Sequence, residues 1–413
     1  MLSLLKCSGK STDVLKAPTT LIESRFKPEY FTRNRKMPFV KLLKFLITLM
    51  KVSTQCALNL FFEEEGITMS QQALSRARNK FNHTPFLKVF EAIRDMMYDE
   101  ENSPDLERCE GLIVIAIDGS QMPLPNIPKL RKKYGGTGSK SSSPTARASI
   151  AYDVTNDFIM DADFVPLSVG ERTLAMQHIK KVGEIINLKE ALFIFDRGYP
   201  CEELIRELSE SSHYLMRLRR KFSTNIDELG LGSHIITLYG DVKVRIVKLE
   251  LPSGEIETLI TNLFDLDESK FKKLYFMRWP VEVKYDIVKN KLELPNFGGF
   301  TENVIMQDFW ISMYLLNMAA VAKHEADVLI KRERTGKNNK YEYQANVNTV
   351  IGSLRNRLAD AVFFTDEADR DKKILRIIAE IQRSVIPIRP DSNVVRYCNP
   401  RKTKFHHNKK SNV

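Results

Sequence analysis

Apolar and polar residues follow two different patterns along this chain. Residues 37–100 carry apolar side chains at helical spacing, as in FVKLLKFLITLM and TPFLKVFEAIRDMM, and they predict a mostly helical region. From residue 111 onward the pattern changes to short, continuous apolar runs such as GLIVIAID and ALFIFD, which are typical of buried strands. Because helical segments separate these runs, we expect an α/β sheet that helices cover on both faces.

Further segments extend this prediction toward the C-terminus. ASIAYDVTNDFIMDADFVPL predicts a hairpin that turns at residues 155–157, and helices are expected over about residues 171–188 and in PCEELIRELSES. HYLMRLRR predicts another strand, and the alternation within residues 221–265 predicts a β-rich insertion. A long apolar helix is expected in ENVIMQDFWISMYLLNMAAVAKHEADVLI, followed by two more helices and a basic arm from residue 387.

The charge balance favours a polyanionic partner. The 413 residues include 63 Lys and Arg against 52 Asp and Glu, which gives a formal charge of +11 and a pI of about 9.2. Excess positive charge on a folded protein favours nucleic acid, because binding to phosphates releases the counterions condensed on them. A basic but otherwise ordinary soluble protein is the alternative.

Cysteine usage and hydropathy bound the cellular setting. Five cysteines are scattered without a metal-ligand spacing, so neither a zinc site nor a disulfide framework is predicted. The apolar run in MLSLLKCSGK is too short for a secretory signal, and FVKLLKFLITLM is far shorter than a membrane span. We therefore expect a soluble, cytoplasmic protein with no membrane partner.

One stretch, YFMRWPVEVKYDIVK at residues 275–289, places four polar side chains at a fixed spacing. In a continuous α-helix Tyr275, Arg278, Glu282 and Lys289 fall within an arc of about 60°. Pro280 must either begin the helix that carries Glu282 or kink it. Lysines half a turn away predict a solvent-exposed face, and apolar residues flank the row on both edges; these are Lys273, Lys284 and Lys291, and Phe276, Val281, Val283, Ile287, Val288 and Leu292.

Three carboxylates are candidates for a metal centre. Asp118 and Asp196 each follow the predicted end of a buried strand, and Glu282 lies on the inward side of its helix. Because carboxylates at the carboxyl ends of neighbouring strands converge, these three could hold two Mg²⁺ or Mn²⁺ ions for phosphoryl transfer. Each has a plainer alternative: an Asp–Gly turn at Asp118, a local Asp–Arg pair at Asp196, and a salt bridge between Glu282 and Arg278.

At these residues the sequence resembles the DDE transposases of bacterial insertion sequences, specifically the IS-four family. The signature of that family places Tyr, Arg, Glu and Lys at the spacing of Tyr275, Arg278, Glu282 and Lys289, and IAIDGS and FIFDRGY resemble its two aspartate motifs. LPNFGGFTENVIMQDFWISMYLLNMAA and MSQQALSRARNKF are similar to family segments after the glutamate and ahead of the core. The likeness covers about residues 65–330.

The resemblance implies an RNase H-like mixed sheet core with a β-rich insertion, plus helical N-terminal and C-terminal regions. The expected division is a DNA-binding N-terminal region, a first core part, the insertion, a second core part and a C-terminal region with a basic tail. These parts would span residues 1–105, 106–220, 221–265, 266–335 and 336–413.

The resemblance also implies roles for the singled-out residues. Two carboxylates from strand ends and one from a helix would bind Mg²⁺ or Mn²⁺ and carry catalysis; these are Asp118, Asp196 and Glu282. Three further residues would contact DNA phosphates near the cut end, where an arginine forks onto a phosphate and a lysine supplies a point charge; these are Tyr275, Arg278 and Lys289.

Basic residues outside the signature are weaker candidates for DNA contact. Ser70 is expected to cap a helix whose end carries Arg76, Arg78 and Lys80, and phosphate contact and a solvated helix face are equally good interpretations there. A basic Gly/Ser loop would contribute more, although a merely solvated loop fits as well; its candidates are Arg131, Lys132, Lys133 and Lys140. GGTGSK in that loop lacks Walker spacing, and isolated histidines such as His178 and His213 are assigned to no metal.

The preferred hypothesis is a transposase of a bacterial insertion sequence. It would bind the terminal inverted repeats of its element and target DNA as a homodimer, and would cut and join strands in cut-and-paste transposition. An inactive transposase-derived DNA-binding protein and an RNase H-fold nuclease without strand transfer are the alternatives. The presence of all three carboxylates counts against the inactive protein, because each is easily lost once chemistry is unneeded.

Overall fold

The chain divides into two compact units, each assembled from segments that are distant in sequence. The computed structural model describes residues 2–33, 35–48, 52–99, 101, 105–136, 143–363 and 366–389. The first unit comprises Met1–Asn102, Pro123–Lys132 and Val288–Val413, and the second comprises Ser103–Met122 and Lys133–Ile287.

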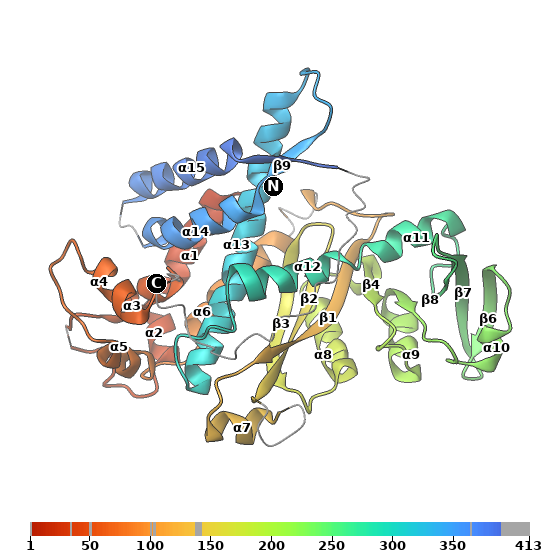
Figure 1. The fold of residues 1–413 in the computed structure, drawn as a ribbon, viewed down its shortest axis with the longest axis horizontal. Helices are drawn as coiled ribbons and strands as arrows, with labels where there is room; N and C mark the ends of the chain where they lie inside the picture. Colours follow the sequence, from red (N-terminus) through yellow and green to blue (C-terminus); the bar gives the residue numbers. More distant parts are fainter. Residues whose placement is uncertain are drawn as a thin grey trace. The chain divides into compact units, whose positions relative to one another are not determined.

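The second unit is built on one eight-stranded mixed sheet with the order β3-β2-β1-β4-β5-β8-β7-β6 (Figure 1). Strands β1, β4 and β5 run parallel, whereas the β2–β3, β5–β8, β7–β8 and β6–β7 pairs are antiparallel. The strands are β1 (Ile113–Pro123), β2 (Thr145–Asp153), β3 (Phe158–Pro166), β4 (Ala191–Phe195), β5 (His213–Arg217), β6 (Gly232–Leu238), β7 (Val242–Glu250) and β8 (Ile256–Thr261).

The apolar runs of the sequence form the central strands of this sheet. All five residues of β4 are buried, and so are the first five of β1, as expected for strands with a helix layer on each face. Helix α8 (Glu171–Gly183) packs on β2 and β3, α9 (Glu202–Ser211) packs on β5, and α11 (Glu268–Phe276) packs on β7. The predicted α/β sheet is confirmed, and so is the hairpin that turns between β2 and β3.

Strands β6, β7 and β8 continue the same sheet beyond β5. β8 pairs antiparallel with β5, with Leu215 opposite Thr261, and β7 then pairs with β8. The buried Arg245 of β7 fixes the exit from β8, because its Nη1 donates to the carbonyls of Leu263, Phe264 and Leu266. The strand alternation read in the sequence therefore reflects an extension of the core sheet.

The first unit is helical and is organised around one long central helix, α13 (Glu302–Arg334), which Thr301 caps through Val304 N–H. α13 packs against α1, α6, α14 and α15, which come from both ends of the chain (Figure 1). The other elements of this unit are α1 (Leu4–Lys16), α2 (Pro18–Ser24), α3 (Phe39–Ile47), α4 (Thr54–Phe61), α5 (Gln71–Arg78), α6 (Thr84–Tyr98), β9 (Tyr343–Ala345), α14 (Val347–Val362), α15 (Glu367–Arg383) and β10 (Val385–Pro387).

Within the described part of the chain, α13 is the one helix long and apolar enough to cross a membrane. Its most apolar window is 89% buried inside the protein, where it packs on other helices. The remaining short elements are α7 (Pro128–Tyr134), the 3₁₀ turn Leu188–Glu190, α10 (Thr224–Asp227), α12 (Pro280–Asp286) and the π-helical turn Ile287–Lys291.

Candidate active site

Asp118 and Asp196 are set side by side by the register of two parallel strands. β1 and β4 pair with Ala116 opposite Ile194, and each aspartate lies two residues beyond its member of that pair. Asp196 follows the last residue of β4, as predicted. The prediction that Asp118 follows the end of its strand is wrong, because β1 stays in the sheet beside β2 and runs on to Pro123 after β4 has ended.

Asp118 is held in a largely buried position by its neighbours. Its Oδ1 accepts a 2.8 Å hydrogen bond from the N–H of Gly119, and its carbonyl accepts a 2.7 Å bond from the hydroxyl of Tyr285. Burial raises the pKa of the Asp118 carboxyl to about 6, although the Gly119 N–H and the positive charge of Arg278 act in the opposite direction. A cation bound beside Asp118 would therefore stabilise the ionised form of this carboxyl, which burial disfavours.

The turn after β4 holds Asp196 in place. The N–H of Gly198 donates to Asp196 Oδ1 at 2.5 Å, and the Tyr199 N–H donates to the Asp196 carbonyl at 3.2 Å. A Cβ at position 198 would lie 3.2 Å from that same Oδ1, which is tighter than ordinary contact. A glycine in FDRGY thus lets the backbone approach the carboxylate closely.

Glu282 lies in the first turn of α12, which begins at Pro280 and is separate from α11. A proline suits this place because the first helical residue needs no N–H partner. The single continuous helix used to predict one polar face is therefore wrong. Its consequences hold only in part. Lys273 is exposed as expected, whereas Lys284, also expected in solvent, is buried and pairs with Asp157 at 2.6 Å, and Phe276 of the apolar edge is 72% exposed.

Arg278 lies between two of the predicted catalytic carboxylates. Its Nη2 donates to Glu282 Oε1, and its Nη1 lies 3.7 Å from Asp118 Oδ2. The Arg278 side chain is only 15% exposed. The plainer alternative for Glu282, a salt bridge with Arg278, is present, and it coexists with the approach of Arg278 to Asp118.

These carboxylates suit a hard cation by their chemistry. Carboxylate oxygens are the ligands that Mg²⁺ and Mn²⁺ prefer, and Asp118 and Glu282 already gather around one positive group. The ligand atoms of the predicted three are not all within 4.8 Å of one another. Among the described residues, the ligand atoms of a different group, Asp161, Asp163 and His178, do lie within this distance of one another.

Glu171 is a fourth carboxylate near the aspartates that sequence reasoning missed. It begins α8, pairs with Arg147 of β2 at 3.3 Å, and its charge contributes to the raised pKa of Asp118. Its side chain lies 3.7 Å from a Cβ built on Gly119 and 4.0 Å from one built on Gly198, so it reaches both aspartate turns. An acidic residue in the first turn of a helix was the only signal in the sequence.

Tyr199 was also missed, and its hydroxyl belongs to the same neighbourhood. The side chain is 2% exposed, and burial raises its pKa well above the usual range, with the charges of Asp118, Glu171 and Asp196 adding to that rise. The hydroxyl is buried and has no hydrogen-bond partner among the described residues. Leaving a hydroxyl unpaired is costly, so its place beside three carboxylates fits a site that takes up a further group.

The other signature residues lie in different surroundings. Tyr275 is 8% exposed and belongs to an apolar cluster with β1, β4 and β5, and burial raises its pKa to about 12. Lys289 lies in the π-helical turn and belongs to the first compact unit, whereas the carboxylates belong to the second. Contact of Tyr275, Arg278 and Lys289 with DNA stays a prediction.

The weaker basic candidates divide into buried, exposed and undescribed residues. Ser70 caps α5 as expected, but Arg78 is buried in an ion pair with Asp308 and is not available to phosphate in this fold. Three basic residues predicted in a loop lie on the short helix α7 instead, with the last two exposed; these are Arg131, Lys132 and Lys133. Lys140 lies outside the described residues.

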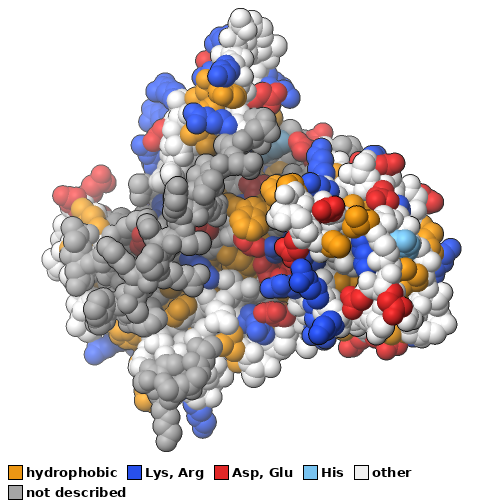
Figure 2. Space-filling model, turned by 45° about the vertical axis from the view of Figure 1, so that its right-hand side comes forward, with side chains coloured by type: hydrophobic (Ala, Val, Ile, Leu, Met, Phe, Trp, Pro, Cys, Tyr) orange, Lys and Arg blue, Asp and Glu red, His pale blue; other side chains and the backbone are white. Residues whose placement is uncertain are grey.

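Basic residues do not form one continuous area on the face drawn in Figure 2. There, the described Lys and Arg side chains are interspersed with Asp and Glu, and clusters of both signs lie next to each other. The net charge of +11 therefore gives no simple outline of a DNA-binding surface on this face. Residues 390–413, outside the described part, add six basic residues against one acidic residue.

Comparison with known proteins agrees with this architecture. The family described as the transposase DDE domain matches residues 110–318, half of the chain. The chain is 23% identical over 175 residues to a protein of Escherichia coli K12 named as the transposase InsZ, covering 40% of this chain and 56% of that protein. It is 24% identical over 166 residues to a protein of Geobacillus stearothermophilus named as a transposase for insertion sequence element IS5377, covering 36% and 42%.

The matched segments thus span about half the length of these curated relatives. Among solved structures, the fold is similar to a piggyBac transposase in a synaptic complex with hairpin DNA, with a TM-score of 0.53 at 10% identity. That similarity covers 91% of this chain and 85% of the other, and it supports the predicted RNase H-like core with helical flanking regions.

Proposed function

Because the chain belongs to the transposase DDE domain family, we propose that it is the transposase of a bacterial insertion sequence and that it cuts and joins DNA strands. In this proposal it binds the terminal inverted repeats of its element and target DNA, and it acts as a homodimer. It works in the cytoplasm, bound to the nucleoid. The observation that carries the proposal is the shared register that sets Asp118 beside Asp196 in a chain of this family.

The proposed catalytic residues are Asp118, Asp196 and Glu282, which would hold Mg²⁺ or Mn²⁺. Two ions held there would supply activation of the attacking oxygen and stabilisation of the leaving oxygen of a phosphodiester. The chain's own contribution is to hold the carboxylates: the Gly119 and Gly198 N–H groups each orient one aspartate oxygen. Tyr285 links the backbone of β1 to that of β2, since its hydroxyl lies 2.7 Å from the Asp118 carbonyl and 3.0 Å from the Ala148 carbonyl and shares its one proton between them.

Arg278 has a second role in this proposal. Without metal it pairs with Glu282 and lies close to Asp118, and with DNA bound its planar fork can take a phosphate oxygen instead. Glu171 would position Arg147 and add negative charge beside the aspartates. Lys289, Tyr275 and the basic residues of α7 remain the proposed partners of the DNA backbone.

The experiment is strand cleavage of labelled element-end DNA in Mg²⁺. Asp118→Ala is expected to lower cleavage by about a thousandfold while end binding stays nearly unchanged, because the carboxylate serves chemistry and not affinity. Asp241→Ala is the matched control, since Asp241 is exposed and pairs with Arg206 of the same unit. Equal cleavage by Asp118→Ala and the control would refute the assignment.

The same assay separates the alternatives. A transposase-derived binding protein would bind ends but cleave no better than Asp118→Ala. A nuclease would cleave yet fail to insert pre-cut ends with a free 3′ hydroxyl into target DNA, whereas the proposed transposase inserts them. Glu171→Gln should reduce cleavage severalfold, less than Asp118→Ala, because it removes charge and orientation but not a proposed metal ligand.

A further inference from the structure

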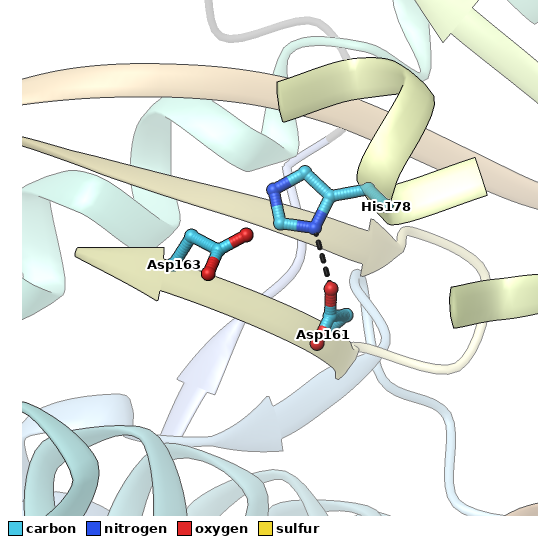
Figure 3. A group of neighbouring side chains, drawn as sticks. All are labelled: Asp161, Asp163 and His178. Atoms are coloured by element: carbon cyan, nitrogen blue, oxygen red, sulfur yellow. Dashed lines mark hydrogen bonds and ion pairs between the residues drawn. The ribbon is translucent and has the colours of Figure 1, made fainter. Parts of the chain in front are cut away.

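Three metal-ligating side chains gather where β3 meets α8, away from the residues proposed for catalysis. Asp161 and Asp163 lie two residues apart on β3 and so face the same side of the sheet, and His178 reaches them from α8 (Figure 3). One ligand atom from each of the three lies within 4.8 Å of the other two. We propose that Asp161, Asp163 and His178 bind a divalent transition-metal ion such as Mn²⁺ or Zn²⁺.

The histidine is fixed in the manner of a metal ligand. Its Nδ1 lies 2.7 Å from Asp161 Oδ2, the distance of a hydrogen bond, so the ring already directs a nitrogen at this carboxylate. Its Nε2 lies 2.9 Å from the Ser149 hydroxyl, so the far side of the ring has a hydrogen-bond partner that sets its orientation. The ring is fully buried and cannot turn away into solvent.

The charge of this cluster calls for a cation. Two carboxylates face one imidazole, and the Asp163 carboxylate has no hydrogen bond or ion pair with any residue that the structure describes. Lys181, whose charge acts on Asp163, is engaged with Glu184 at 3.2 Å. Two partly buried carboxylates with so little compensation are costly, and a bound divalent ion removes that cost.

The ligand set selects the kind of metal. Imidazole suits first-row transition metals, and carboxylates suit Mg²⁺, Ca²⁺ and Mn²⁺, so one histidine with two aspartates favours an ion that accepts both. The proposed catalytic set of Asp118, Asp196 and Glu282 contains oxygen ligands alone. A nitrogen ligand therefore distinguishes the two sites experimentally.

A metal ion here would also support the proposed active site. It would join β3 to α8, the helix that begins with Glu171. The Ser149 hydroxyl that holds His178 also lies 3.4 Å from the Asp118 carbonyl, so the cluster is one hydroxyl away from the backbone of β1. This metal site itself does not depend on the proposed DNA cleavage.

The test uses the full chain, stripped with a chelator and then given excess Mg²⁺ to fill sites made only of oxygen ligands. One equivalent of Mn²⁺ is added, and pulsed electron paramagnetic resonance looks for coupling to an imidazole nitrogen. We expect coupling in the unaltered protein and none in His178→Gln. Asp163→Asn should weaken Mn²⁺ binding about tenfold or more, and Asp196→Asn, the matched control from the proposed catalytic set, should keep the coupling.

Asp163→Asn tests the site even if the buried His178→Gln variant does not fold, because Asp163 is only partly buried and its replacement disturbs the packing less. Circular dichroism checks that each variant is folded. The proposal is overturned if the unaltered protein shows no nitrogen coupling, which is the result expected when hydrogen bonds among His178, Asp161 and Ser149 hold the cluster without a metal ion. It is also overturned if the coupling and the Mn²⁺ affinity survive in Asp163→Asn. Neither result depends on cleavage, so failure here is distinguishable from failure of the transposase assignment.

Discussion

Two arginines, one in each compact unit, pair with acidic residues in opposite ways. Arg78, in the helical unit, is 4% exposed; its Nε donates to Gln307 at 3.0 Å and its Nη2 donates to Asp308 at 2.7 Å. The second oxygen of Asp308 accepts a hydrogen bond from the N–H of Gly298, so both oxygens of this carboxylate have partners inside the protein. Arg278, in the sheet unit, instead spans the carboxylates of Asp118 and Glu282.

The difference shows how a structural arginine is distinguished from one in a site. Arg78 and Asp308 each have fixed partners inside the fold. Another cation therefore cannot take the place of the Arg78 guanidinium unless the surrounding residues rearrange. Around Arg278 the carboxylates are less completely bonded, and Glu282 is 38% exposed, so a metal ion can replace the guanidinium beside the carboxylates, and a phosphate can replace the carboxylates beside the guanidinium. The predictions below measure that contrast, beginning with the largest effect.

Arg78→Ala should lower the free energy of unfolding by about 3–5 kcal/mol, because it leaves Asp308 buried without its ion-pair partner. Urea unfolding of the full chain measures this. Arg76→Ala, an exposed arginine on the same helix, is the control and should change the free energy by less than about 0.5 kcal/mol. Equal, small losses in both variants would remove the distinction drawn between Arg78 and Arg278.

The position of Arg78 also marks a limit of reasoning from sequence. The basic cluster at the end of α5 was open to phosphate contact or to solvent, and neither is true of Arg78. Its partner Asp308 lies 230 residues away on α13. No local pattern relates the two, because their meeting depends on how α13 packs in the first unit.

The sheet was predictable for physical reasons that the helices do not share. Apolar runs that must be buried on both faces specify β4 and the buried first half of β1, but not the later residues of β1 up to Pro123. The register between these parallel strands then places Asp196 beside Asp118. The structure of residues 275–289 was harder to predict, because a prediction from helical periodicity assumes that they form one unbroken helix. The break between α11 and α12 buried Lys284, whose partner Asp157 is in a hairpin turn far along the chain. The neighbours of Glu171 and His178 could not be predicted for the same reason, because these residues meet their partners only when α8 packs on β2 and β3.

The pH dependence of stability gives the next largest effect and tests the burial of Asp118. Its pKa is raised from 3.8 to about 6, so between these values the folded protein holds a proton that the unfolded chain has lost. Stability from this group is therefore present below about pH 4 and is lost as the pH rises through about 6, by at most about 3 kcal/mol.

Urea unfolding in a chelator at several pH values checks this. Asp118→Asn, which resembles the protonated acid, should lack that part of the decline between pH 4 and 7, whereas Asp241→Asn should follow the unaltered protein. A decline that is unchanged in Asp118→Asn would mean that other groups cause it, and that Asp118 has no special need for a cation.

The smallest effect should come from Arg278 itself, and it carries the comparison furthest. Arg278→Ala removes the shared partner of Asp118 and Glu282, which should cost about 1–2 kcal/mol in a chelator, less than at Arg78 because Glu282 can turn to water. Adding Mg²⁺ should restore more stability in Arg278→Ala than in the unaltered protein, because no guanidinium then competes for the carboxylates. Arg206→Ala is the control: Arg206 also pairs with two carboxylates, Glu202 and Asp241, but lies at the surface away from the site. If Mg²⁺ stabilises both variants equally, the ion does not replace Arg278. The contacts of Arg278 with Asp118 and Glu282 would then serve the fold alone, as the Arg78–Asp308 ion pair does.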